Sequence, residues 1–259
     1  MKHRHRPSYI TVARYTVVEA LRSGLPWLAS ACMLGVLGLS GFLSSVAIAD
    51  ASSLQASAAG ALLRAAAVFL IASHVVSSVS REANDKGLEL ALALPVSRPA
   101  YFIGKLSGFC CVGAMLATFF SVPILIWARP ADLAAWWLSL AAEAGLVAAA
   151  ALFFASAMAQ AVAALAATAG LYLLGRSMSA IQAIASAPQA GDSLPADATR
   201  WFVDVLALLL PRLDTATRSD WLLYGAPGAG ELMPVLFGLG LYFLFLAAAG
   251  MFDFSRRNL

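Results

Sequence analysis

The sequence predicts an all-α integral membrane protein with six transmembrane helices, and three observations predict this fold class. Of the 259 residues, 61% are hydrophobic and only 12% are charged, whereas a soluble domain is about half apolar and about a quarter charged. The mean hydropathy is +0.81. Six stretches are each apolar over about 20 residues, which is the length that a helix needs to cross a bilayer. The polar surface is therefore too small for a soluble globule of this length.

The six apolar stretches are each expected to be helical, because every backbone amide in hydrocarbon must be hydrogen-bonded within its own segment. The fourth and fifth stretches adjoin without a charged residue between them. We predict a tight turn near Ala159 and Gln160, because one helix of the combined length would exceed a normal span. The predicted spans cover residues 25–48, 61–79, 101–127, 134–158, 161–174 (extending towards 184) and 232–252.

The distribution of basic residues predicts the orientation. Eleven of the 17 lysine and arginine residues lie before the first span, after the last, or from the end of the second span to the start of the third. Cytoplasmic segments carry the excess of lysine and arginine, and an even number of spans places both termini on one side. We therefore expect a multi-pass protein of the cell inner (cytoplasmic) membrane, surrounded by lipid, with both termini in the cytoplasm. We expect no nucleic-acid partner.

Two segments outside the spans are expected to lie along the membrane surface. Residues 9–23 place Ile10 and Val17 on one helical face and polar residues on the other, which is typical of an amphipathic helix in the cytoplasmic headgroup layer. The loop 177–231, expected on the extracytoplasmic side, contains an apolar run at 201–210 that is too short to span. We expect this run to form a short helix in the outer leaflet before the last span.

The charged linker 80–98, between the second and third spans, is the most informative segment. Glu82 and Lys86 are four residues apart, which favours a helical ion pair. Pro95 interrupts this helix, and Ser97 is suited to cap the next one. The linker is therefore expected to be a short cytoplasmic helix between two spans, which can transmit force from a cytoplasmic partner. The alternative is a solvated loop whose basic residues only set the topology.

The same linker resembles the cytoplasmic loop of the ABC-2 type transporter permease family (type V ABC exporter-like membrane subunits). In that loop an acidic residue, Gly-x-x-Glu, a leucine-rich turn, Pro-[Val/Ile]-Ser-Arg and Gly-Lys follow one another. The corresponding residues here are Glu82, Gly87, Glu89 (one residue early for the family spacing), Pro95, Val96, Ser97, Arg98, Gly104 and Lys105. The resemblance covers the layout of the whole chain, 1–259, as a single transmembrane permease domain, and it is most specific over residues 82–105.

The resemblance implies a membrane-spanning permease subunit that exports an unidentified substrate by ATP-driven alternating access. A separate ABC ATPase subunit, in two copies, would dock on the linker, which is the coupling helix in that family. A second permease copy, expected to form a homodimer, would complete the path, and an extracytoplasmic protein is a further candidate partner. The residues implied in coupling to the ATPase are Glu82, Lys86, Gly87, Glu89, Pro95 and Arg98.

The chain itself has no nucleotide-binding loop, which requires Gly-x-x-x-x-Gly-Lys-[Ser/Thr]. Gly104 and Lys105 are followed by Leu106, and Pro99 stands where the first glycine is needed. We therefore expect no enzyme activity and no cofactor in this chain, with ATP and magnesium bound by the partner subunit. The three cysteines lie in apolar runs without the spacing of a metal site, so no bound metal is expected.

Glu143 is an acidic residue well inside a predicted span, where a charged side chain costs about 2.5 to 3.5 kcal/mol unless it is paired or hydrated. Together with His74 it is a candidate for the translocation path, and the alternative for each residue is a structural hydrogen bond in the core. Arg64 and Arg176 lie near the outer ends of their predicted spans. Both arginine side chains are expected to reach the lipid headgroups, and the alternative for each is a functional role.

Small residues are dense in the first and fifth spans, and close packing of helices in lipid uses such faces. In the resembled family these two spans line the interface between the permease copies. The alternative is that alanine is simply abundant in this chain. The implied dimer-interface residues are Gly35, Gly38, Gly41, Ala163, Ala167 and Gly170.

Two other classes of function compete with a permease. A non-transporting membrane scaffold or assembly factor would have the same topology but would not dock an ATPase. An intramembrane enzyme has no support in the sequence, because the predicted spans contain neither paired aspartates nor a His-Glu-x-x-His motif.

Overall fold

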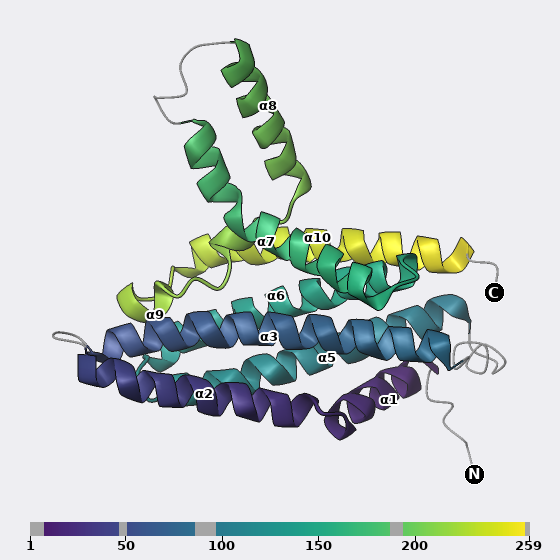
Figure 1. The fold of residues 1–259 in the computed structure, drawn as a ribbon, viewed down its shortest axis with the longest axis horizontal. Helices are drawn as coiled ribbons and strands as arrows, with labels where there is room; N and C mark the ends of the chain where they lie inside the picture. Colours follow the sequence, from purple (N-terminus) through teal and green to yellow (C-terminus); the bar gives the residue numbers. More distant parts are fainter. Residues whose placement is uncertain (1–7, 47–50, 86–96, 187–193, 257–259) are drawn as a thin grey trace.

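The computed structural model describes residues 8–46, 51–85, 97–186 and 194–256, and its regular elements over these residues are helices (Figure 1). They are, in chain order, α1 (Ser8–Arg22), α2 (Leu25–Val46), α3 (Ala51–Asn84), α5 (Arg98–Ile124), α6 (Pro130–Ala157), α7 (Ala161–Ala185), α8 (Leu194–Leu209), the 3-10 turn η2 (Leu213–Thr215), α9 (Trp221–Tyr224) and α10 (Ala229–Arg256).

Six of the described helices, α2, α3, α5, α6, α7 and α10, are long and apolar enough to cross a membrane. This result confirms the predicted all-α fold with six candidate spans. The turn between the fourth and fifth spans also lies where the sequence places it. Helix α6 ends at Ala157, and the backbone of Met158 and Gln160 is extended before α7 begins at Ala161.

Helix α3 is longer than the sequence predicts. It begins at Ala51 instead of residue 61, and it continues to Asn84. Polar residues in its first two turns lower the hydropathy there, but the side-chain amide of Gln55 donates a hydrogen bond to the carbonyl of Ser40 in α2 (2.8 Å). A helix of 34 residues is about 51 Å long, whereas the hydrocarbon core of a bilayer is about 30 Å thick. Part of α3 therefore extends beyond the length needed to cross.

Helices α2, α3, α5, α6 and α10 and the first part of α7 lie roughly side by side, and α1 lies at one end of them, where the described chain also begins and ends (Figure 1). Helices α3, α5 and α6 are buried over more than half of their lengths, whereas α2, α7 and α10 are buried over less than a quarter. The first three helices therefore form the core, and the other three surround it. We call the end of the bundle that carries α1 the α1 end, and the opposite end, which carries α9, the α9 end.

The second half of α7 and all of α8 form a hairpin that projects from the side of the bundle (Figure 1). At the base of the hairpin, the hydroxyl of Tyr242 in α10 donates a hydrogen bond to the carbonyl of Leu208 in α8 (2.6 Å). The predicted boundaries of the loop 177–231 are wrong at its start, because α7 continues to Ala185. A helix, α8, is present at the predicted place and contains most of the apolar run at 201–210, and its position in the outer leaflet stays a prediction.

Helix α1 packs across α5 at two glycines. A Cβ atom at Gly104 would lie 2.7 Å from the carbonyl oxygen of Tyr9, and one at Gly108 would lie 2.6 Å from Cβ of Thr16. Real Cβ atoms essentially never approach so closely, so the absence of side chains at these positions lets the two backbones touch. A helix is present as α1 at the predicted position 9–23, with one of its faces buried against the bundle, and its place in the headgroup layer stays a prediction.

We expect Gly108→Val to destabilise the chain, because the new side chain would overlap Thr16 and force α1 away from α5. Overpacking of this kind typically costs about 1–3 kcal/mol. Gly240→Ala in α10 is the matched control, since a Cβ atom there meets no atom within 4 Å and alanine favours a helix. Thermal unfolding of the purified chains in detergent measures the difference, and equal unfolding temperatures would contradict this packing of α1.

Candidate functional site

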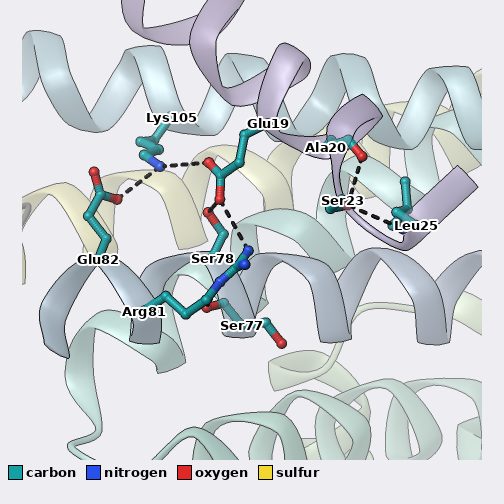
Figure 2. Close-up of polar contacts among 9 residues, drawn as sticks. All are labelled: Glu19, Ala20, Ser23, Leu25, Ser77, Ser78, Arg81, Glu82 and Lys105. Atoms are coloured by element: carbon teal, nitrogen blue, oxygen red, sulfur yellow. Dashed lines mark hydrogen bonds and ion pairs between the residues drawn. The ribbon is translucent and has the colours of Figure 1, made fainter. Parts of the chain in front are cut away.

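A group of charged and polar side chains, the polar cluster, joins α1, α3 and α5 at the α1 end (Figure 2). Its centre is Glu19 on α1. The hydroxyl of Ser78 on α3 donates a hydrogen bond to Oε1 of Glu19 (2.8 Å), and Nη2 of Arg81 lies 3.4 Å from the same oxygen. Two side chains on one face of α3 therefore bind the carboxylate of Glu19.

Lys105 completes the polar cluster from α5. Its Nζ lies 2.9 Å from Oε2 of Glu82 and 3.7 Å from Oε2 of Glu19, and Figure 2 shows it between the two carboxylates. The lysine side chain is only 9% exposed, so its ammonium group depends on these carboxylates for compensation of its charge. One lysine therefore connects α5 with both α1 and the end of α3.

The polar cluster lies where the chain leaves α3 and enters α5, which is where the linker begins and ends. Glu82 lies in the last turn of α3, and Arg98 begins α5. Nη1 of Arg98 donates to the carbonyl of Ser255 near the end of α10 (3.4 Å). Both ends of the linker are thus attached to neighbouring helices. Four of the residues implied in coupling lie outside the described residues, namely Lys86, Gly87, Glu89 and Pro95.

The structure corrects the predicted start of the linker at residue 80. Because α3 continues to Asn84, Glu82 belongs to a long spanning helix and not to a separate short one. Glu82 and Lys105 were identified through the resemblance, whereas the role of Glu19 was not predicted. The one signal for Glu19 is that it is the sole acidic residue of α1, a helix that also carries two arginines.

A second group of charges lies deep in the bundle around Glu143 of α6. Its carboxyl group is fully buried, and neither of its oxygens has a hydrogen-bond donor within the described residues. Nη1 of Arg176 on α7 forms an ion pair with Oε1 of Glu143 at 3.7 Å, and Arg64 on α3 is close enough to interact with the same carboxylate. We call Glu143, Arg64 and Arg176 the buried charged centre.

Residues 211–226, which we call the capping segment, run between α8 and α10 and are held by both arginines. Arg176 donates from Nη1 to two carbonyls of the segment, one of them that of Ala216 (2.7 Å). Arg64 donates from Nη1 to the carbonyl of Thr217 (2.8 Å). The expectation that these arginines reach the lipid headgroups is therefore wrong. Carbonyls of an irregular segment are costly to leave unpaired in apolar surroundings, and the arginines supply the missing donors.

Thr217 fixes the shape of the capping segment. It is fully buried and has a φ angle of +45°, a conformation that costs a residue with a side chain roughly 1–3 kcal/mol. Its N–H (2.8 Å) and its hydroxyl (3.1 Å) both donate to Oγ of Ser139 on α6. These two hydrogen bonds offset the strain. Ser139 lies one helical turn before Glu143 on α6, so the bonds also hold the segment close to Glu143.

Close packing holds the remainder of the capping segment. A Cβ atom at Gly60 on α3 would lie 2.5 Å from Cδ1 of Leu222, and one at Gly175 on α7 would lie 2.7 Å from the carbonyl oxygen of Pro211. Oδ1 of Asp132, in the first turn of α6, accepts a hydrogen bond from the backbone N–H at the end of the segment (2.6 Å). The segment is therefore attached to α3, α6 and α7 at once.

His74 does not share the surroundings of Glu143. It is buried in α3, and its ring lies edge-on to that of Phe109 in α5, with centroids 6.0 Å apart. Among the described residues, its Nε2 atom has no hydrogen-bond partner. The structure brings Glu143 together with Arg64 and Arg176 and places His74 elsewhere, so the two candidate path residues lie in separate environments.

The small-residue faces of α2 and α7 are open within this chain. A Cβ atom built at the glycines of these faces would meet no atom of the described chain within 4 Å, and these glycines are Gly35, Gly38, Gly41 and Gly170. Ala163 is exposed and Ala167 is half-buried. These faces are therefore available to lipid or to another helix, and their role in a dimer stays a prediction.

The fold and the two charged groups describe a multi-pass, all-helical membrane protein whose polar residues are concentrated at one end and in the middle of the bundle. No protein-family model and no curated protein matches the chain.

We expect Lys105→Met to lower the free energy of unfolding by about 1–3 kcal/mol, because it removes the ion pair of Glu82 and one of the two cations beside Glu19. This is less than the cost for a fully buried ion pair, since the carboxylates are partly exposed. The control is Arg218→Met, which breaks an ion pair with Asp220 whose side chains are 53% and 54% exposed, and such a surface pair contributes little. Unfolding of the purified variants in detergent measures both effects.

The double variant Lys105→Met/Glu82→Gln separates the ion pair from the packing of the lysine. Removing the acid as well eliminates one unpaired charge, so part of the lost stability is expected to return. A double variant no more stable than Lys105→Met would show that the contact with Glu82 contributes nothing.

Proposed function

We propose that the chain is the membrane-spanning permease subunit of an ABC transporter of the ABC-2 type, which exports a substrate by ATP-driven alternating access together with a separate ATPase subunit. In this proposal the linker between α3 and α5 is the coupling helix, and the α1 end faces the cytoplasm. The observation that carries the proposal is the polar cluster, which joins three helices beside the point where the ATPase would dock.

A displacement of the linker would reach the membrane helices through the polar cluster. Because Lys105 is buried between Glu19 and Glu82, α5 cannot separate from α1 and α3 without leaving charges unpaired in poorly solvated surroundings. The contact between Arg98 and Ser255 extends the connection to α10. The ends of the linker would therefore move together with α1, α3, α5 and α10.

Two copies of the chain, with one ATPase on each, would form the translocation path in this proposal. The open small-residue faces of α2 and α7 support a contact between copies, because close helix packing in lipid uses glycine and alanine. Helix α1 would lie in the cytoplasmic headgroup layer. The hairpin of α7 and α8 would lie in the outer leaflet, where the exposed Trp201 and Phe202 of α8 suit a membrane interface or an extracytoplasmic partner protein.

Co-purification tests this proposal. We expect the tagged chain, co-expressed with an ABC ATPase subunit from the same genome, to form a stable complex that hydrolyses ATP. The substitutions Gly87→Asp and Glu89→Lys in the linker are expected to lower the ATP turnover of the complex several-fold, because they disturb the docking surface. The exposed substitution Arg218→Met is the matched control, and it is expected to leave turnover unchanged.

Two results would contradict the proposal. A chain that never forms a complex with an ATPase is not a permease subunit of this type. ATP turnover that is unaffected by both linker substitutions would favour the alternative, a membrane scaffold or assembly factor with the same topology and no coupling to ATP hydrolysis.

A further inference from the structure

The capping segment penetrates between the helices instead of covering them as a surface loop. Leu213, Ala216 and Thr217 are each fully buried, although the regular structure around them is only the three-residue turn η2 and the four-residue helix α9. A segment this irregular pairs only some of its own backbone groups, through short-range turns. Its position therefore depends on hydrogen-bonding groups supplied by α3, α6 and α7.

Packing of buried side chains holds part of the capping segment, whereas its hydrogen bonds are of a kind that can be exchanged. The deepest ones come from three side chains, Arg64, Arg176 and Ser139. Arginine has a long side chain and donates equally well to water, phosphate or carboxylate groups. Breaking these bonds therefore does not leave the guanidinium groups without acceptors, provided that other acceptors reach them when the segment moves.

The capping segment also contributes a carboxylate near the buried charged centre. Arg176 is paired with Glu143, and Asp214, which belongs to the segment itself, is a further and weaker electrostatic partner of Arg176. Displacement of the segment would withdraw this carboxylate together with the carbonyls that accept hydrogen bonds from the two arginines. The guanidinium groups would then be open to water or to a ligand with acceptor groups.

The strain at Thr217 also favours two distinct positions of the capping segment over a gradual movement. Thr217 keeps its positive φ angle while its N–H and hydroxyl are bonded to Ser139. Once these bonds are lost, the residue can relax to an ordinary conformation, and the segment cannot return to its site without restoring the strained one.

We propose that the capping segment is a lid over the buried charged centre, and that it opens when the hydrogen bonds from Arg64 and Arg176 to its backbone break. That the lid closes a transport path, on the side away from the ATPase, rests on the proposed function. That the lid is held closed by the two arginines is a property of this chain alone. The two statements therefore have separate tests.

The first test measures how well the lid is closed in the chain alone. The native residues Cys32, Cys110 and Cys111 are replaced by alanine, and Ala216→Cys is introduced as a reporter in the full-length chain in lipid nanodiscs. A charged thiol reagent is expected to label this cysteine slowly. Arg176→Gln is expected to raise the labelling rate at least about tenfold, since loss of a charged hydrogen bond shifts an opening equilibrium by roughly that factor or more.

Two controls distinguish opening of the lid from loss of the fold. Arg218→Gln alters an exposed arginine of the same segment and is expected to leave the labelling rate unchanged. A second reporter, Ala117→Cys, lies in the buried core of α5 and is expected to stay protected in the Arg176→Gln chain. Rapid labelling of Ala216→Cys with both arginines intact, no effect of Arg176→Gln, or equal exposure of both reporters would each overturn the lid.

The second test asks whether the lid moves during ATP hydrolysis. Oγ of Ser139 and Oγ1 of Thr217 are 3.1 Å apart, so cysteines at these two positions are expected to form a disulfide that fixes the lid. In the complex with the ATPase, oxidation is expected to lower ATP turnover several-fold and reduction to restore it. Unchanged turnover would remove the lid from the transport cycle. Failure to obtain any complex would instead contradict the proposed function, and the labelling result would stand independently.

Discussion

Backbone hydrogen bonding in apolar surroundings is the constraint on which the rest of this structure depends. The six long helices satisfy it internally, whereas the capping segment does so only in part, because it is irregular and partly buried. The arginines on α3 and α7 and Ser139 on α6 supply what the segment lacks. Glu143 then compensates positive charge that would otherwise be isolated in the core. The intramembrane charges are thus a consequence of burying non-helical backbone.

The two charged groups of the bundle differ in their access to solvent, and this difference separates their roles. At the α1 end, Glu19 and Glu82 are partly exposed while Lys105 is buried. The ion pairs of the polar cluster can therefore rearrange, since water can reach either carboxylate and replace a lost partner. Glu143, by contrast, is fully buried, so its ion pair can change only together with the segment that covers it.

Much of the fold could be predicted from the sequence, because a spanning helix leaves a long apolar signal that depends on one segment alone. The start of α3 was missed because its first turns are polar and pack through Gln55. Glu143 was found because an isolated carboxylate in a span is conspicuous. The roles of Arg64 and Arg176 could not be found, since their partners are carbonyls of an aperiodic segment; Arg64 and Thr217 are 153 residues apart in the chain.

Helix α3 carries residues of both charged groups, with Arg64 near its middle and Glu82 in its last turn. Their separation of 18 residues corresponds to about 27 Å along a helix, and no proline lies between them. Such a helix behaves as a stiff rod over this length. Rotation of α3 about its own axis by the linker would swing the Arg64 guanidinium through the same angle, so an event at one side of the bilayer would alter hydrogen bonding near the other without any relay of intermediate side chains.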